Sequence, residues 1–190
     1  SRSKISRLEG GRHGVKLRDV ADLLTLYGVT DEAERATLLT LAEQANTPAW
    51  WQYYGDVVPA WMQVCLGVEQ AASLIRCFEV QRVPHLLQTP DYARASLRLA
   101  HPGAGAEEID RRFRLRMTRQ RILHRRPATQ FWAVIDEAAL RRPVGGLDVM
   151  RAQLRHLIEI CRLPQVTVQI LPFLGGGHAA ESGPVTILRL

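Results

Sequence analysis

The stretch FWAVIDEAAL, residues 131–140, decides the fold class of the chain. Its first half is dominated by aromatic and β-branched residues, which favour a strand. From Asp136 onward the residues are typical of a helix, so we predict that the strand turns helical near this position. Both kinds of element are therefore expected in one domain.

The segments on either side of this stretch also predict strands and helices. Thr89 followed by Pro90 predicts a helix start, because proline is favoured at the first helical position. Strands are expected over 73–83, 166–173 and 184–190, and helices over 61–72, 89–100, 107–124 and 147–161. About four strands and about five helices without a strict βαβ rhythm predict an α+β domain over residues 61–190.

The N-terminal segment predicts helices only. SRSKISRLEGGR, residues 1–12, has Ile5 and Leu8 three positions apart and ends near two glycines, as is typical of a short helix. A second helix with one apolar face is expected to end at Gly28, and Thr30 is expected to cap a third. We therefore expect an all-helical module over 1–46. Residues 47–60 combine prolines with large aromatic side chains, which predicts a linker docked on the protein.

Composition excludes several classes of protein. A hydrophobic fraction of 46% is sufficient for a folded core, and no apolar run reaches the roughly 18 residues that a membrane helix needs. The N-terminus does not resemble a signal peptide. Three scattered cysteines are typical of reduced thiols, and six histidines lack metal-ligand spacing. The chain is expected to be cytoplasmic, to bind no metal or cofactor, and not to cross a membrane.

The positive charge is concentrated at the N-terminus. Residues 1–18 carry six Lys and Arg against one acid, a net charge of +5, and residues 19–46 carry one base against six acids, a net charge of −5. A module polarised in this way has one face suited to phosphates. The interpretation that competes with DNA binding is an amphipathic surface helix whose bases serve solubility.

The first predicted helix carries the kinds of side chain that a DNA recognition helix needs. Arginine can bind guanine bidentately, so Arg2 and Arg7 are candidate base readers, together with the outward-facing Ser3 and Ser6. The remaining bases would contact phosphates and position the protein. The candidate phosphate contacts are Lys4, Arg12 and Lys16.

Several segments resemble a known family. ISRLEGGR is similar to the end of the recognition helix in Cro/C1-type (XRE) helix-turn-helix domains. The order of five further segments is similar to an actinobacterial regulator family, although His85 stands where glycine is usual and Val185 where an aromatic residue is common. These segments are Trp50-Trp51, VPHLLQTPDYARA (83–95), RRPVGGLDVMRAQL (141–154), VTVQILPF (166–173) and GPVTIL (183–188).

The resemblance implies a truncated helix-turn-helix module, whose first two helices precede Ser1, followed by a C-terminal domain of unknown function. It implies an antitoxin-like transcriptional regulator that binds double-stranded DNA. Such regulators are often paired with a small partner protein. A homodimer would place two recognition helices in successive major grooves. The C-terminal domain, residues 61–190, is expected to hold the dimer and to receive a partner or effector.

Arg112, Arg116 and Arg119 share one face of the helix expected over 107–124. They could bind a small acidic protein or contact the DNA backbone. The same spacing also fits a solvated helix whose arginines pair with nearby acids. All three interpretations remain open on the sequence alone.

Signals for catalysis and for a small-molecule site are weak. Asp136 and Glu137 are adjacent and would point to opposite faces of a strand, and His178 follows a glycine triplet typical of a flexible loop. We therefore expect that the chain has no catalytic residues and is not an enzyme. The aromatic residues could line a small-molecule pocket or form a small core between modules. They are Trp50, Trp51, Tyr54, Trp61 and Trp132.

Overall fold

The computed structural model describes residues 16–46, 49–178, 180 and 183–190, and the chain divides into two compact units, Ser1–Gln52 and Tyr53–Leu190. The helix expected over 1–12 lies outside the described residues. No helix in the described part combines the length and the apolar character that crossing a bilayer requires.

The described part of the N-terminal unit contains α2 (Leu17–Leu26), α3 (Glu32–Asn46) and the start of a short 3-10 helix, Trp50–Tyr54. Gly28 has a φ of 73°, the left-handed conformation that ends α2 as the sequence predicted. The predicted cap at Thr30 is wrong by one residue, because the backbone N–H of Glu34 donates to Oδ1 of Asp31 over 2.7 Å. A carboxylate accepts this bond better than a hydroxyl at the positive end of the helix dipole.

Replacing Asp31 with alanine is expected to destabilise the first turn of α3 by about 1 kcal/mol, since the amide of Glu34 loses its acceptor. Amide hydrogen exchange in that turn measures the change. Asp22→Ala is the matched control, because Asp22 is an exposed acid on α2. Equal protection in both variants would contradict the capping role.

The C-terminal unit is built on a four-stranded sheet in the order β3-β2-β1-β4. The strands are β1 (Leu74–Glu79), β2 (Gln130–Asp136), β3 (Val166–Leu171) and β4 (Val185–Arg189). β1, β2 and β3 are parallel, with Ile75 opposite Phe131 and Phe131 opposite Val166, and β4 is antiparallel to β1. The parallel pairs are connected through helices, as parallel strands require.

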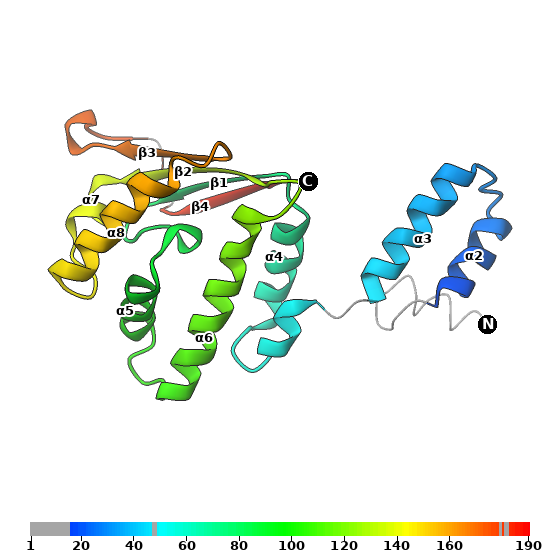
Figure 1. Ribbon diagram of the computed structural model, residues 1–190, viewed down its shortest axis with the longest axis horizontal. Helices are drawn as coiled ribbons and strands as arrows, with labels where there is room; N and C mark the ends of the chain where they lie inside the picture. Colours follow the sequence, from blue (N-terminus) through cyan, green and yellow to red (C-terminus); the bar gives the residue numbers. More distant parts are fainter. Residues whose placement is uncertain (1–15, 47–48, 179, 181–182) are drawn as a thin grey trace. The chain divides into compact units, whose positions relative to one another are not determined.

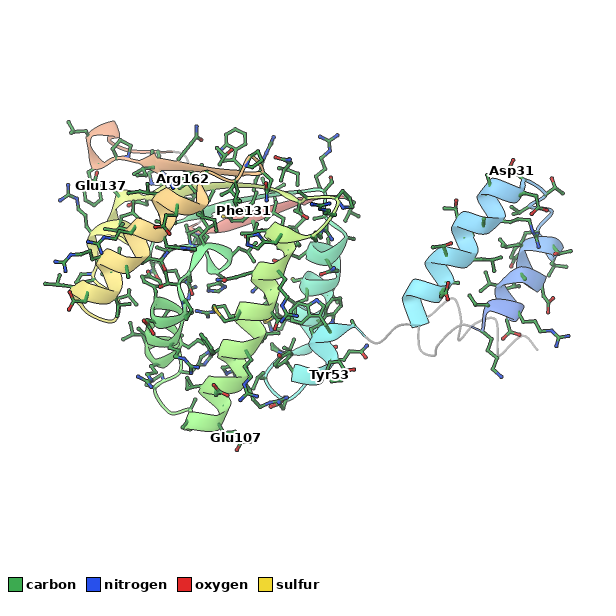
Figure 2. The ribbon with its side chains drawn as sticks, in the orientation of Figure 1. Asp31, Tyr53, Glu107, Phe131, Glu137 and Arg162 are labelled. Carbon is green, nitrogen blue, oxygen red and sulfur yellow. The ribbon has the colours of Figure 1, made fainter. Side chains whose placement is uncertain are left out.

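The helices of this unit cover one face of the sheet (Figure 1). They are α4 (Ala60–Ala71), α5 (Pro90–Ala100), α6 (Ala106–Arg119), α7 (Glu137–Arg141) and α8 (Leu147–Ile160), with 3-10 turns at His85–Leu87, Gln120–His124 and Phe173–Gly175. On β2, Phe131, Ala133 and Ile135 point into the core beneath the helices, whereas Trp132 is 37% exposed on the other face. Figure 2 labels Phe131 on this strand.

The predicted α+β class is confirmed. β2 ends at Asp136 and α7 follows at once, and Thr89 caps α5 with Pro90 at its first position. Three predicted elements are too long. The strands expected over 73–83 and 166–173 end at Glu79 and Leu171, and the helix expected to reach His124 becomes a 3-10 turn after Arg119.

The early end of β1 has a physical cause. Beyond Glu79 the backbone is bonded by side chains instead of a neighbouring strand: Val83 donates to the hydroxyl of Tyr92 over 3.1 Å, and Gln88 donates to the carbonyl of Val83 over 2.7 Å. Buried backbone groups require such partners. The loop between β1 and α5 is therefore held at a defined place against α5.

Two more glutamines hold the same loop. Gln153 of α8 donates to the carbonyl of Leu87 and accepts from the N–H of Thr89, both over 2.7 Å. Gln120 donates to the carbonyls of His85 and Gln88 over 3.0 and 2.8 Å. The 3-10 turn at His85–Leu87 is thus attached to the helices on both sides of it.

Candidate functional site

A cavity of about 290 Å³, which we call the arginine cavity, lies between α4, α5, α6 and the loop after β1. Its apolar lining comes from Met62, Leu97, Ala100 and Leu115, and within the described chain no acidic residue lines it. Its polar lining is entirely basic or imidazole, and these side chains are Arg82, His85, His101, Arg112, Arg116 and Arg119.

α6 supplies three of these arginines because its apolar and basic positions recur at helical spacing. Arg112 pairs with Glu108 over 2.8 Å and donates to the carbonyl of Val57 over 3.1 Å. Arg119 makes a two-pronged pair with Glu69 of α4, with distances of 3.0 and 2.7 Å. Both guanidinium groups are therefore fixed in direction and largely compensated in charge.

Arg116 differs from its two neighbours on the helix. It is 8% exposed, and its one hydrogen bond within the described chain is from Nη1 to Oε1 of Gln88, over 2.9 Å. No carboxylate of the described residues lies within ion-pairing distance of it. Burial, with help from the charges of Arg82 and Arg119, lowers the pKa of Arg116 to about 10, so the group is still charged at neutral pH. A buried cation without a carboxylate partner is costly to the folded state.

Two further groups at this cavity lack partners. The Nε atom of Arg82 and the Nε2 atom of His85 are buried, and neither has a hydrogen-bond partner among the described residues. The nearest carboxylate oxygen of Glu79 is 4.0 Å from Arg82, beyond hydrogen-bonding distance. Burial and the charges of the three surrounding arginines lower the pKa of His85 well below its usual value, so the imidazole is neutral at pH 7.

The sequence predicted that Arg112, Arg116 and Arg119 share a face, and all three line the cavity. That face is turned toward α4, α5 and the loop after β1, so the arginines point into the domain. Binding of an acidic protein there stays a prediction. Sequence reasoning missed Arg82 and His85, whose positions beside α6 depend on the loop contacts of Gln88 and Gln120.

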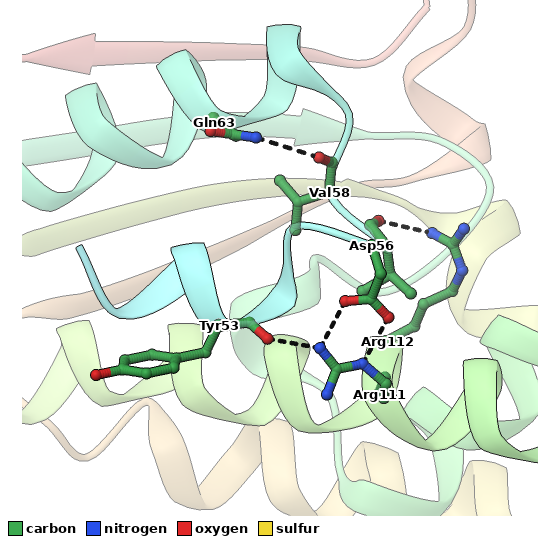
Figure 3. Close-up of polar contacts among 7 residues, drawn as sticks. Tyr53, Asp56, Val58, Gln63, Arg111 and Arg112 are labelled. Atoms are coloured by element: carbon green, nitrogen blue, oxygen red, sulfur yellow. Dashed lines mark hydrogen bonds and ion pairs between the residues drawn. The ribbon is translucent and has the colours of Figure 1, made fainter. Parts of the chain in front are cut away.

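Arg111 is not among the residues that line the cavity. It fixes the start of the C-terminal unit through the contacts drawn in Figure 3. It bonds the Asp56 carboxylate with distances of 2.6 and 2.5 Å and donates to the carbonyl of Tyr53. The hydrogen bond from Arg111 is the main reason why the pKa of Asp56 lies below its usual value. This part of the predicted linker therefore packs on α6.

The pocket considered for the aromatic residues stays a prediction. Trp61 is exposed on α4, whereas Trp132 lies on the open face of the sheet, stacked near Arg76 and bonded to Gln169 over 2.9 Å. Neither lines the arginine cavity. Trp50 and Trp51 contact each other edge-on, and Tyr54 lies near Arg111.

A histidine and a carboxylate meet at the end of β2. Nε2 of His178 is 4.0 Å from Oδ2 of Asp136, and Oδ1 of Asp136 caps α7 through the N–H of Ala138. Glu137 points elsewhere and accepts from the N–H of Phe173. Within the part of the chain that the structure describes, no serine or cysteine is bonded to His178, and no cluster of side chains could hold a metal ion.

Of the predicted DNA contacts, Lys16 is described and is exposed just before α2. The other six lie outside the described residues: Arg2, Ser3, Lys4, Ser6, Arg7 and Arg12.

Comparison with known families assigns each unit. A model described as a helix-turn-helix domain matches residues 1–38, and a model described as Domain of unknown function (DUF5753) matches residues 62–190, more than half of the chain. The chain belongs to the DUF5753 family. The helix-turn-helix match confirms the predicted class of the N-terminal module, and actinobacterial origin and an antitoxin-like role stay predictions. No curated protein and no solved structure matches the chain.

The DUF5753 match begins within α4 and contains the whole sheet. It also contains every residue of the arginine cavity, from Met62 to Arg119. The cavity is therefore a feature of the DUF5753 part of this chain and lies outside the helix-turn-helix match.

Proposed function

We propose that the chain is a sequence-specific DNA-binding transcriptional regulator of the cytoplasm. The observation that carries the proposal is the helix-turn-helix match over residues 1–38. The net charge of +5 over residues 1–18 supports it, because phosphate contacts need a basic face. The proposal assigns no catalytic activity to either unit.

In this proposal the helix predicted over 1–12 enters the major groove. Arg2 and Arg7, with Ser3 and Ser6, read base edges, while Lys4, Arg12 and Lys16 contact phosphates. The chain acts as a homodimer, since two recognition helices one helical turn apart match a pseudo-palindromic operator.

Arg2→Ala and Arg7→Ala are each expected to weaken operator binding by about tenfold or more. The measurement is fluorescence anisotropy at fixed salt with an operator selected from random DNA. Arg114→Ala is the control, because Arg114 is an exposed arginine of α6 paired with Asp110. Unchanged affinity in both N-terminal variants would refute the assignment of this helix.

A second function belongs to the C-terminal unit, and the arginine cavity favours it. We propose that this unit receives a small-molecule effector that regulates DNA binding. Capture of a small acidic protein, as in an antitoxin, is the competing proposal. The inward direction of Arg112, Arg116 and Arg119 favours a ligand small enough to enter the domain.

A further inference from the structure

We propose that the arginine cavity binds a small organic anion, in which one phosphate or carboxylate group is attached to a compact apolar body. The proposal rests on the regulatory role proposed above and names the chemical class of the effector. The six basic and imidazole side chains of the cavity would hold the anionic group, and its four apolar side chains would hold the body.

The charge balance of the cavity calls for an anion. Arg112 and Arg119 have carboxylate partners at 2.8 and 2.7 Å. Arg116 has none in the described chain, and Arg82 has only Glu79 at 4.0 Å. Glu79 is itself half-buried; burial raises its pKa, and the nearby charges of Arg82 and Arg116 act against that rise. One carboxylate therefore faces two arginines. A bound anion would supply the charge that the protein leaves out.

The unpartnered hydrogen-bonding atoms give independent support. Nε2 of His85 and Nε of Arg82 are buried without partners in the described chain, and both residues line the cavity. A buried polar atom without a partner costs free energy unless a ligand or water satisfies it. A neutral imidazole can donate through Nε2, and a guanidinium donates through Nε, so both atoms can bond an oxyanion.

The size and the lining of the cavity limit the ligand. A volume of about 290 Å³ is near the lower end of the range for ligand sites, which favours a small ligand over a long acyl chain. The apolar side chains of Leu97, Ala100 and Leu115 would leave a bare inorganic ion only partly enclosed. A single small ring or short chain that carries one anionic group satisfies both limits.

The basic side chains are also graded in exposure. Arg82 and Arg112 have side chains 38% and 25% exposed, and those of Arg119 and Arg116 are more buried. An entering anion would meet Arg82 and Arg112 first. It would keep its bond to Arg82 as it reaches the deeper Arg116, where the dielectric is lower and the interaction stronger. Arg116 would therefore contribute most to affinity.

The proposal is tested by isothermal titration of the full chain with three probes of similar size at fixed ionic strength: phenyl phosphate, benzoate and benzyl alcohol. One or both anions are expected to bind with one site per chain, and benzyl alcohol is not. Tighter binding of phenyl phosphate assigns the site to phosphate monoesters, and tighter binding of benzoate assigns it to carboxylates.

Two variants locate the site. Arg116→Met and Arg82→Gln are each expected to weaken binding of the anion by about tenfold or more, because each removes a charged hydrogen-bond donor. Arg114→Met is the matched control on the same helix. The side chain of Arg114 is 67% exposed, pairs with Asp110 and lies outside the cavity, so this variant should bind the anion with unchanged affinity. If Arg116→Met does not fold, Arg82→Gln still decides the question, since Nε of Arg82 has no hydrogen-bond partner among the described residues and its nearest Glu79 oxygen is 4.0 Å away.

Three results would overturn the proposal: neither anion binds, benzyl alcohol binds as tightly as the anions, or Arg114→Met weakens binding as much as the cavity variants do. The titration contains no DNA. A failure of anion binding is therefore distinguishable from a failure of operator binding in the Arg2 and Arg7 variants.

Discussion

Replacing Gln153 with leucine is expected to lower the free energy of unfolding of the Tyr53–Leu190 unit by about 4 kcal/mol. The side chain of Gln153 is fully buried, and its two ends bond the carbonyl of Leu87 and the N–H of Thr89. Leucine has a similar volume but cannot donate or accept. Both backbone groups would lose their partners in a place that water does not reach.

Urea unfolding of the full chain, followed by tryptophan fluorescence, measures the change as a shift in midpoint at constant slope. Gln81→Leu is the matched control, because Gln81 is exposed in the loop between β1 and α5. A loss of less than about 1 kcal/mol in Gln153→Leu would mean that the loop is held by its other contacts alone.

Replacing Ile135 with alanine is expected to destabilise the same unit by about 3 kcal/mol. Ile135 is 0% exposed on β2 and packs into the core between the sheet and the helices. The loss combines the transfer of the removed methyl and methylene groups with the cavity they leave, since a strand with a paired neighbour on each side cannot move to fill it.

Ile187→Ala is the control for this experiment. It removes the same atoms from β4, where Ile187 is 58% exposed and shares the open face of the sheet with Trp132, and should cost less than about 1 kcal/mol. Equal losses at the two positions would mean that the open face is covered in solution, for example by a second copy of the chain.

These two positions show what local sequence patterns can and cannot predict. The aromatic and β-branched residues at the start of FWAVIDEAAL predict a strand, and the structure confirms it through Asp136. This composition does not say which face of the strand is buried. That depends on the helices, which cover Ile135 and leave Trp132 exposed.

The buried glutamines were outside the reach of sequence reasoning. Gln153 lies on a helix that the sequence predicts well. Its hydrogen bonds, however, are to Leu87 and Thr89, which lie 66 and 64 positions earlier in the chain. A polar residue on a predicted helix is usually assigned to solvent. Only the packing of α8 against the loop after β1 buries Gln153 and brings it within hydrogen-bonding distance of that loop.

The sequence by itself determined the class of each unit and the common face of Arg112, Arg116 and Arg119, because helical periodicity is a local property of the chain. The tertiary structure decided what that face meets. α4 brings Glu69 to Arg119, the loop after β1 brings Arg82 and His85 into the cavity, and Arg116 is left as a buried cation without a carboxylate among the described residues. Periodicity specifies which side chains point together, but the charge and burial around them come from segments distant in the sequence, which only the folded chain brings into contact.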